Sequence, residues 1–143
     1  MRHITFILLV GSYLLALVIN LMPSIKYPDA SIGLLNMFVT IVFIVLLLVY
    51  SQKGSKFIRV FSILGGLSGL IVFIITSFEQ DMIGNGVLDL ISSIQYPFYV
   101  IFITPLFGGN MLINLTPGIF ALLMTLVYGV GIVVGFNVYS KAE

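Results

Sequence analysis

Hydrophobic positions in this chain form long runs, and the polar stretches between the runs are short. Predominantly apolar runs cover residues 4–22, 32–50, 57–78 and 118–139. A helix needs about 20 apolar residues to cross the hydrocarbon core of a bilayer, so each run is long enough to span it. The pattern predicts an all-α membrane protein, and a chain of 143 residues leaves room for a single domain of four or five spans.

Residues 87–117 do not fit a simple span. Residues 87–96 are amphipathic at helical period, which is typical of a helix lying in the membrane interface. The apolar stretch 98–107 that follows would form a helix of about 15 Å, half the thickness of a membrane. Pro97 and Pro105 would each remove a backbone hydrogen bond from a continuous helix. We therefore expect an extracytoplasmic interfacial or re-entrant segment between the third and fourth spans.

The basic residues separate the two topologies that this pattern allows. Lys and Arg are retained on the cytoplasmic side of a membrane protein. Four spans with a cytoplasmic N-terminus place five of the six basic residues inside, whereas five spans, with residues 87–107 crossing, reduce the split to four against two. The residues placed inside by four spans are Arg2, Lys53, Lys56, Arg59 and Lys141, and Lys26 is outside. We favour a four-helix bundle with both termini cytoplasmic, and five spans remain the alternative.

Composition supports a membrane location and excludes several chemistries. Hydrophobic residues make up 60% of the chain and charged residues 8%, whereas soluble domains have about 25% charged residues. The chain has no cysteine, which excludes thiol catalysis and disulfides, and its net charge of +1 argues against a nucleic-acid partner. Abundant Ile with little Ala indicates an AT-rich bacterial genome. We expect an integral protein of the bacterial plasma (inner) membrane, in contact with membrane lipids.

Small residues recur at helical spacing on the third and fourth spans. Gly65 and Gly69, and likewise Gly131 and Gly135, form the small-xxx-small pattern that lets two helices approach closely in a membrane. These glycines predict helix packing. They could pack within the bundle or against a membrane-protein partner, including a second copy of the chain.

Polar side chains collect in what would be the outer half of the bundle. An amide or hydroxyl in hydrocarbon needs a hydrogen-bond partner. These side chains therefore predict either an interhelical hydrogen-bonded cluster or a polar pocket open to the outer leaflet, with the 87–117 segment as its lid. The candidate pocket residues are Asn20, Asn36, Thr40, Thr76, Tyr99, Phe102 and Asn110.

Ionisable residues are missing from the middle of the spans, where proton relays and ion paths place them. We therefore expect no enzyme activity, no cofactor and no metal site. Four carboxylates fall on the predicted outer side and form an acidic rim that would attract a basic partner. They are Asp29, Glu79, Asp81 and Asp89.

Three non-catalytic functions fit these patterns. The first is an accessory or regulatory subunit of a larger membrane complex, which accounts for the glycine pattern. The second is a lipid- or peptide-binding protein of the envelope-stress or immunity type with an outer-leaflet polar pocket, which accounts for the acidic rim and the aromatic residues of the 87–117 segment. The third is a small pore or holin-like protein, although the spans offer mainly isolated polar residues for a water path.

Overall fold

The computed structural model describes residues 2–26 and 32–140, and these residues are almost wholly helical. The predicted all-α class is confirmed. Five helical stretches are long and apolar enough to cross a membrane. The elements are α1 (Arg2–Leu21), the π-helical turn η1 (Met22–Lys26), α2 (Leu34–Ser51), α3 (Lys56–Met82), α4 (Gly86–Ser93), α5 (Gln95–Phe98), the π-helical η2 (Tyr99–Ile103), the 3-10 helix η3 (Thr104–Gly109), α6 (Asn110–Ile113) and α7 (Pro117–Ser140).

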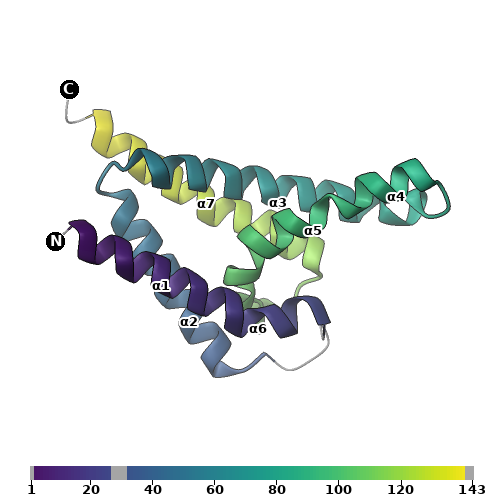
Figure 1. The fold of residues 1–143 in the computed structure, drawn as a ribbon, viewed down its shortest axis with the longest axis horizontal. Coiled ribbons are helices and arrows are strands. Elements are labelled where there is room, and N and C mark those ends of the chain that lie inside the picture. Colours follow the sequence, from purple (N-terminus) through teal and green to yellow (C-terminus); the bar gives the residue numbers. More distant parts are fainter. Residues whose placement is uncertain (1, 27–31, 141–143) are drawn as a thin grey trace.

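The four apolar runs fall on α1, α2, α3 and α7. The largest difference in bounds is at the end of α3, which continues past residue 78 to Met82. Gln80 and Asp81 on this extension are exposed, and the end of α3 projects beyond the rest of the bundle together with α4 (Figure 1). The helix does not need to stop where the apolar run stops, because its polar side chains are solvated there.

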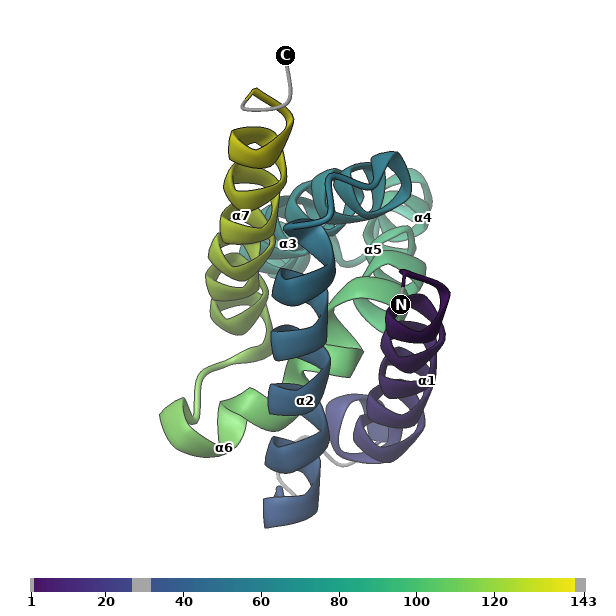
Figure 2. The same ribbon diagram turned by 90° about the vertical axis from the view of Figure 1, so that its left-hand side faces the viewer.

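Two antiparallel helix pairs form the frame of the molecule, α1 with α2 and α3 with α7 (Figures 1 and 2). In the first pair, Lys53 Nζ donates to Thr5 Oγ1 at one end, and the amides of Asn20 and Asn36 are bonded at the other. In the second pair, the start of α3 contacts the end of α7, and the end of α3 contacts the start of α7. These contacts are Arg59 with Phe136, Gly65 with Tyr128, and Thr76 with Gly118.

The antiparallel pairing of α3 and α7 has a consequence for the segment between them. The end of α3 and the start of α7 lie at the same end of the bundle, opposite the two termini (Figure 1). The segment from α4 to α6 therefore begins and ends at that same end of the bundle. On the way it enters the space between the two pairs, with η2 against α3 and η3 against α1 and α2.

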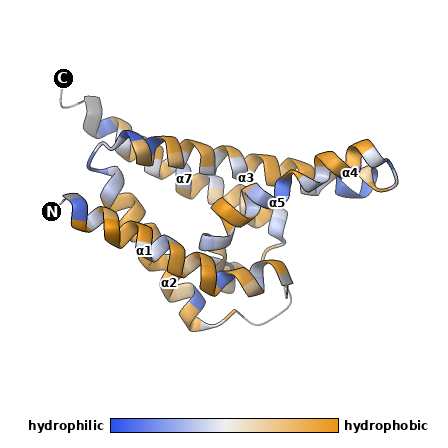
Figure 3. Ribbon diagram, viewed as in Figure 1, coloured by the Kyte–Doolittle hydropathy of each residue, from blue (hydrophilic) through white to orange (hydrophobic). Residues whose placement is uncertain are grey.

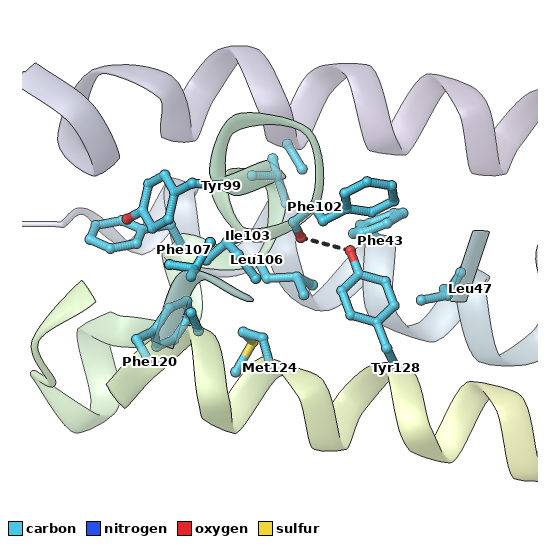
Figure 4. Packing of buried hydrophobic residues seen from close by; sticks show 14 of the residues in the cluster. Phe43, Leu47, Tyr99, Phe102, Ile103, Leu106, Phe107, Phe120, Met124 and Tyr128 are labelled. Atoms are coloured by element: carbon cyan, nitrogen blue, oxygen red, sulfur yellow. Dashed lines mark hydrogen bonds between the residues drawn. The ribbon is translucent and has the colours of Figure 1, made fainter. Parts of the chain in front are cut away.

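The interior is built around this broken segment. Ile103, Leu106 and Phe107 are fully buried between the pairs and pack against α7, where Phe107 meets the ring of Phe120 with centroids 5.5 Å apart (Figure 4). A second group of rings lies closer to the end of the bundle that holds the termini. It contains Tyr13, Phe43, Phe61, Phe102 and Tyr128.

The outer surface of the long helices is apolar. Hydrophilic residues gather at the end that holds the termini and at the projecting α3–α4 tip, with hydrophobic helix between them (Figure 3). Side chains such as Ile7, Val18 and Leu126 are at least 65% exposed. An apolar surface of this extent is favourable in contact with lipid and unfavourable in contact with water.

Candidate functional site

Prolines in two helices release backbone carbonyls, and side chains from other helices bind them. Pro23 has no N–H to donate to the carbonyl four residues earlier in the helix, that of Ile19. The Asn36 amide of α2 donates to Ile19 O at 3.0 Å. In a membrane an unsatisfied carbonyl is costly, so this contact both satisfies the backbone and fixes α2 against α1.

The broken segment also contains a proline, Pro105, in the first turn of the 3-10 helix η3 directly after the π-helical η2. The carbonyl four residues earlier is that of Ile101, and it accepts a 2.9 Å hydrogen bond from the Tyr13 hydroxyl of α1. The next carbonyl, that of Phe102, accepts a 2.7 Å bond from the Tyr128 hydroxyl of α7 (Figure 4). Irregular backbone in the interior of the molecule is thus satisfied by protein on two sides, as a low-dielectric environment requires.

Asn20, Asn36 and Thr40 form a closed hydrogen-bonded cluster. Asn20 Nδ2 donates to Thr40 Oγ1 at 3.0 Å and to Pro105 O at 3.2 Å, and Thr40 Oγ1 also donates to Pro105 O at 3.0 Å. Asn20 Oδ1 accepts a hydrogen bond from Asn36 Nδ2, and Asn36 Oδ1 accepts one from the Gly33 N–H. Each amide uses both its oxygen and its nitrogen, so the cluster holds α1, α2 and η3 together and has little capacity left for a ligand.

The four predicted packing glycines lie at helix contacts inside the molecule. A Cβ on Gly65 would meet the ring of Tyr128, and one on Gly69 would meet Ala121 O of the α7 backbone at 2.5 Å. Gly131 and Gly135 face α2 and α3 more loosely, with the nearest atoms at 3.3 Å and 3.6 Å. The close approach of α3 and α7 thus takes place within the chain.

A pocket of about 220 Å³ lies where η1, α3, α5 and the start of α7 meet. It contains Thr76 and Tyr99 of the predicted pocket and the partly exposed Glu79 of the predicted acidic rim, and it adds the buried Ser24 and Gln95. Apolar side chains complete the wall. They are Ile25, Val72, Tyr96 and Pro117.

Gln95 is the unusual residue of this pocket. It is only 5% exposed, and its Oε1 accepts a 2.9 Å bond from the Thr76 hydroxyl. Within residues 2–26 and 32–140 its amide nitrogen donates no hydrogen bond, and it is not one of the fully buried atoms that lack a partner, so it is accessible from the pocket. Tyr99 donates to Ser24 O at 3.3 Å and keeps its oxygen free to accept. The pocket therefore offers a donor from Gln95 and a carboxylate from Glu79.

The other predicted site residues lie elsewhere. Phe102 belongs to the ring cluster, and Asn110 closes the turn before α7 through two bonds to the backbone of Leu115, at 2.8 and 2.9 Å. Asp81 and Asp89 are exposed at the α3–α4 tip. Asp29 lies outside the described residues. No group of three or more potential metal ligands occurs in the described ranges.

Sequence reasoning missed Gln95 and Ser24. Gln95 stands two residues before Pro97 at the end of an amphipathic stretch, where a polar residue is expected to face water. A usable signal was its position relative to Thr76, but the contact between them depends on the turn at residues 83–85, which folds α4 and α5 back along α3. Comparison of the chain with family models, curated proteins and solved structures finds no significant match.

Proposed function

We propose that this protein is a non-catalytic membrane protein that binds an aminophospholipid headgroup in the pocket of Ser24, Thr76, Glu79, Gln95 and Tyr99. The observation that carries the proposal is Gln95, a largely buried side chain whose amide nitrogen is free to donate into a pocket that the Glu79 carboxylate also lines. A phosphoethanolamine group supplies the complement, with its ammonium at Glu79 and a phosphate oxygen at the Gln95 amide. The apolar wall would meet the first carbons of the lipid.

We further propose four spans, with α1, α2, α3 and α7 crossing, the α4–α6 segment re-entrant, and both termini in the cytoplasm of a bacterial cell. Support comes from the antiparallel contact of α3 and α7 and from the five-to-one distribution of basic residues. In this orientation the pocket and the α3–α4 tip lie on the outer side.

The charge of the pocket favours a cation. Glu79 carries the formal charge among the residues that line the pocket, and it has no ion pair in the described part of the chain. A partly buried carboxylate without a counter-ion is stabilised by a primary ammonium that can also donate hydrogen bonds. A quaternary ammonium offers no such donor, so phosphatidylcholine is the informative comparison.

The test is thermal unfolding of the full chain in nanodiscs of phosphatidylcholine with or without phosphatidylethanolamine of the same acyl composition. Phosphatidylethanolamine should raise Tm because a ligand of the folded state stabilises it. Glu79→Gln and Gln95→Leu should each remove most of this rise. Asp81→Asn is the matched control, because it removes an exposed carboxylate of the same helix and should keep the rise.

Equal Tm values in the two lipid mixtures would contradict the proposal. An equal loss of the rise in Glu79→Gln and Asp81→Asn would also contradict it, because the effect would then belong to the acidic surface as a whole. Stabilisation by a soluble basic peptide, with no response to phosphatidylethanolamine, would replace the lipid by a peptide ligand.

An accessory-subunit function is the second candidate, and the α3–α4 tip favours it. No residue of α4 is buried in the described chain, and Val87 and Leu90 are 67% and 70% exposed. An unpartnered apolar face on a projecting helix is typical of an interaction surface. If the tip binds a membrane partner, Leu90→Glu should release a protein that copurifies in fixed ratio with the parent, whereas Asp89→Asn should not.

A further inference from the structure

A second cavity lies at the opposite end of the bundle, between α1, α2 and α3. It has a volume of about 240 Å³ and is lined almost wholly by apolar atoms. Its one hydroxyl, that of Tyr13, is bound to the carbonyl of Ile101. The lining residues are Phe6, Leu9, Val10, Tyr13, Leu14, Phe43, Leu47, Phe57, Ile58 and Phe61.

The wall of this cavity is open to the surrounding lipid on the α1 side. Val10 is 38% exposed and Leu14 is 52% exposed, whereas Phe43 and Leu47 at its back are buried. An apolar cavity without polar partners does not hold ordered water. The matching occupant in a bilayer is a hydrocarbon chain that enters from the side.

Basic residues stand at the end of the cavity nearest the termini. The rings of Phe6 and Phe57 line this end with centroids 5.9 Å apart, and Phe6 also contacts the ring of Tyr50 at 5.7 Å. Lys53 lies over the ring of Tyr50 at 5.8 Å, and Lys56 is exposed in the first turn of α3. Both ammonium groups lie on segments that adjoin this end of the cavity.

We propose that this cavity is a groove that binds one acyl chain of an anionic glycerophospholipid, and that the phosphate of the lipid lies at Lys53 and Lys56. The apolar lining takes the chain, and the two lysines select the headgroup. Charge complementarity carries this choice, because each basic residue near a membrane surface favours an anionic lipid by about fivefold in affinity. The site is separate from the pocket of Glu79 and Gln95, so either can exist without the other.

The chain contains no tryptophan, which makes a direct test available. Leu14→Trp places a single fluorophore at the rim of the groove, and Leu126→Trp places one on the lipid-facing side of α7, where Leu126 is 65% exposed. Each variant is reconstituted in nanodiscs that contain a small fraction of phosphatidylglycerol or of phosphatidylcholine, both carrying the same brominated acyl chains. Bromine quenches tryptophan only at short range.

The expected result is stronger quenching of Leu14→Trp by brominated phosphatidylglycerol than by brominated phosphatidylcholine, with no difference for Leu126→Trp. Adding Lys53→Ala and Lys56→Ala to Leu14→Trp should lower the preference by about fivefold for each lysine. Equal quenching of Leu14→Trp by the two lipids would mean that the tryptophan contacts only bulk lipid, and it would overturn the proposal. A preference that survives the loss of both lysines, or that also appears at Leu126→Trp, would overturn it as well.

Discussion

The ring of Tyr128 fills the space that a side chain at position 65 would need. A Cβ atom on Gly65 would lie 2.6 Å from Cε1 of Tyr128. The ring cannot move aside easily, because Tyr128 is fully buried and its hydroxyl is bound to the carbonyl of Phe102. The contact between α3 and α7 and the support of the broken segment are thus linked through one side chain.

Gly65→Ala should therefore destabilise the protein by about 1–3 kcal/mol, the usual cost of overpacking a well-packed interior. Thermal or denaturant unfolding in detergent measures the change. Gly129→Ala is the control, because a Cβ on Gly129 would meet no atom within 4 Å. Equal stability of the two variants would show that α3 and α7 do not approach each other closely at Gly65.

A neighbouring pair of glycines tests the contact between η3 and α2. A Cβ on Gly108 would collide with the backbone carbonyl of Asn36, whereas one on Gly109 would lie 4.0 Å from its nearest neighbour, Thr40 Cγ2. Backbone cannot rotate away, so Gly108→Ala should cost at least as much as a typical overpacking change, about 1–3 kcal/mol. Gly109→Ala should stay within about 0.5 kcal/mol of the parent, as conservative changes without contacts do. The unfolding midpoint of each variant decides the comparison.

The bond from Tyr13 to the carbonyl of Ile101 should depend on Pro105. Tyr13→Phe should cost about 0.6 kcal/mol and at most about 1.7 kcal/mol, the mean and the maximum found for hydrogen bonds between membrane helices. In a Pro105→Ala background the backbone can pass from its π and 3-10 geometry into an α turn, in which the N–H of residue 105 would bind the Ile101 carbonyl, so the same change should cost less. A double-mutant cycle on unfolding free energies measures the coupling. Additive effects of the two changes would mean that the proline and the tyrosine act independently.

Single cysteines distinguish four spans from five in intact cells. Asn85→Cys and Thr116→Cys flank the α4–α6 segment, so both should react with an impermeant thiol reagent if that segment is re-entrant. Ser55→Cys and Ala142→Cys, the latter outside the described residues, should react only after the membrane is permeabilised. Labelling of Asn85→Cys but not Thr116→Cys from outside would establish a fifth crossing. The absence of native cysteine makes each variant uniquely reactive.

The sequence was sufficient for the class of fold and for the long helices. Their apolar runs are set by the thickness of a bilayer, and Gly65 with Gly69 marks a close helix contact through local spacing alone. The position of Asn20 and Asn36 at one end of their helices also follows from spacing. What these amides bind does not, because Pro105 lies 85 residues from Asn20. Gln95 was missed for the same reason: its surroundings come from α3 and η1, which no local pattern brings to it.

The hydrogen bond between Tyr128 and Phe102 also imposes an order on biosynthesis. The chain emerges from the ribosome N-terminus first, so the partners of the broken segment in α1 and α2 already exist when Phe102 is made. Tyr128 follows 26 residues later, on the last helix. Until α7 is inserted, the Phe102 carbonyl lacks the partner that it has in the folded protein, and exposing it to lipid would be costly. On the proposed topology, entry of the segment to its final depth is therefore expected to follow the insertion of α7.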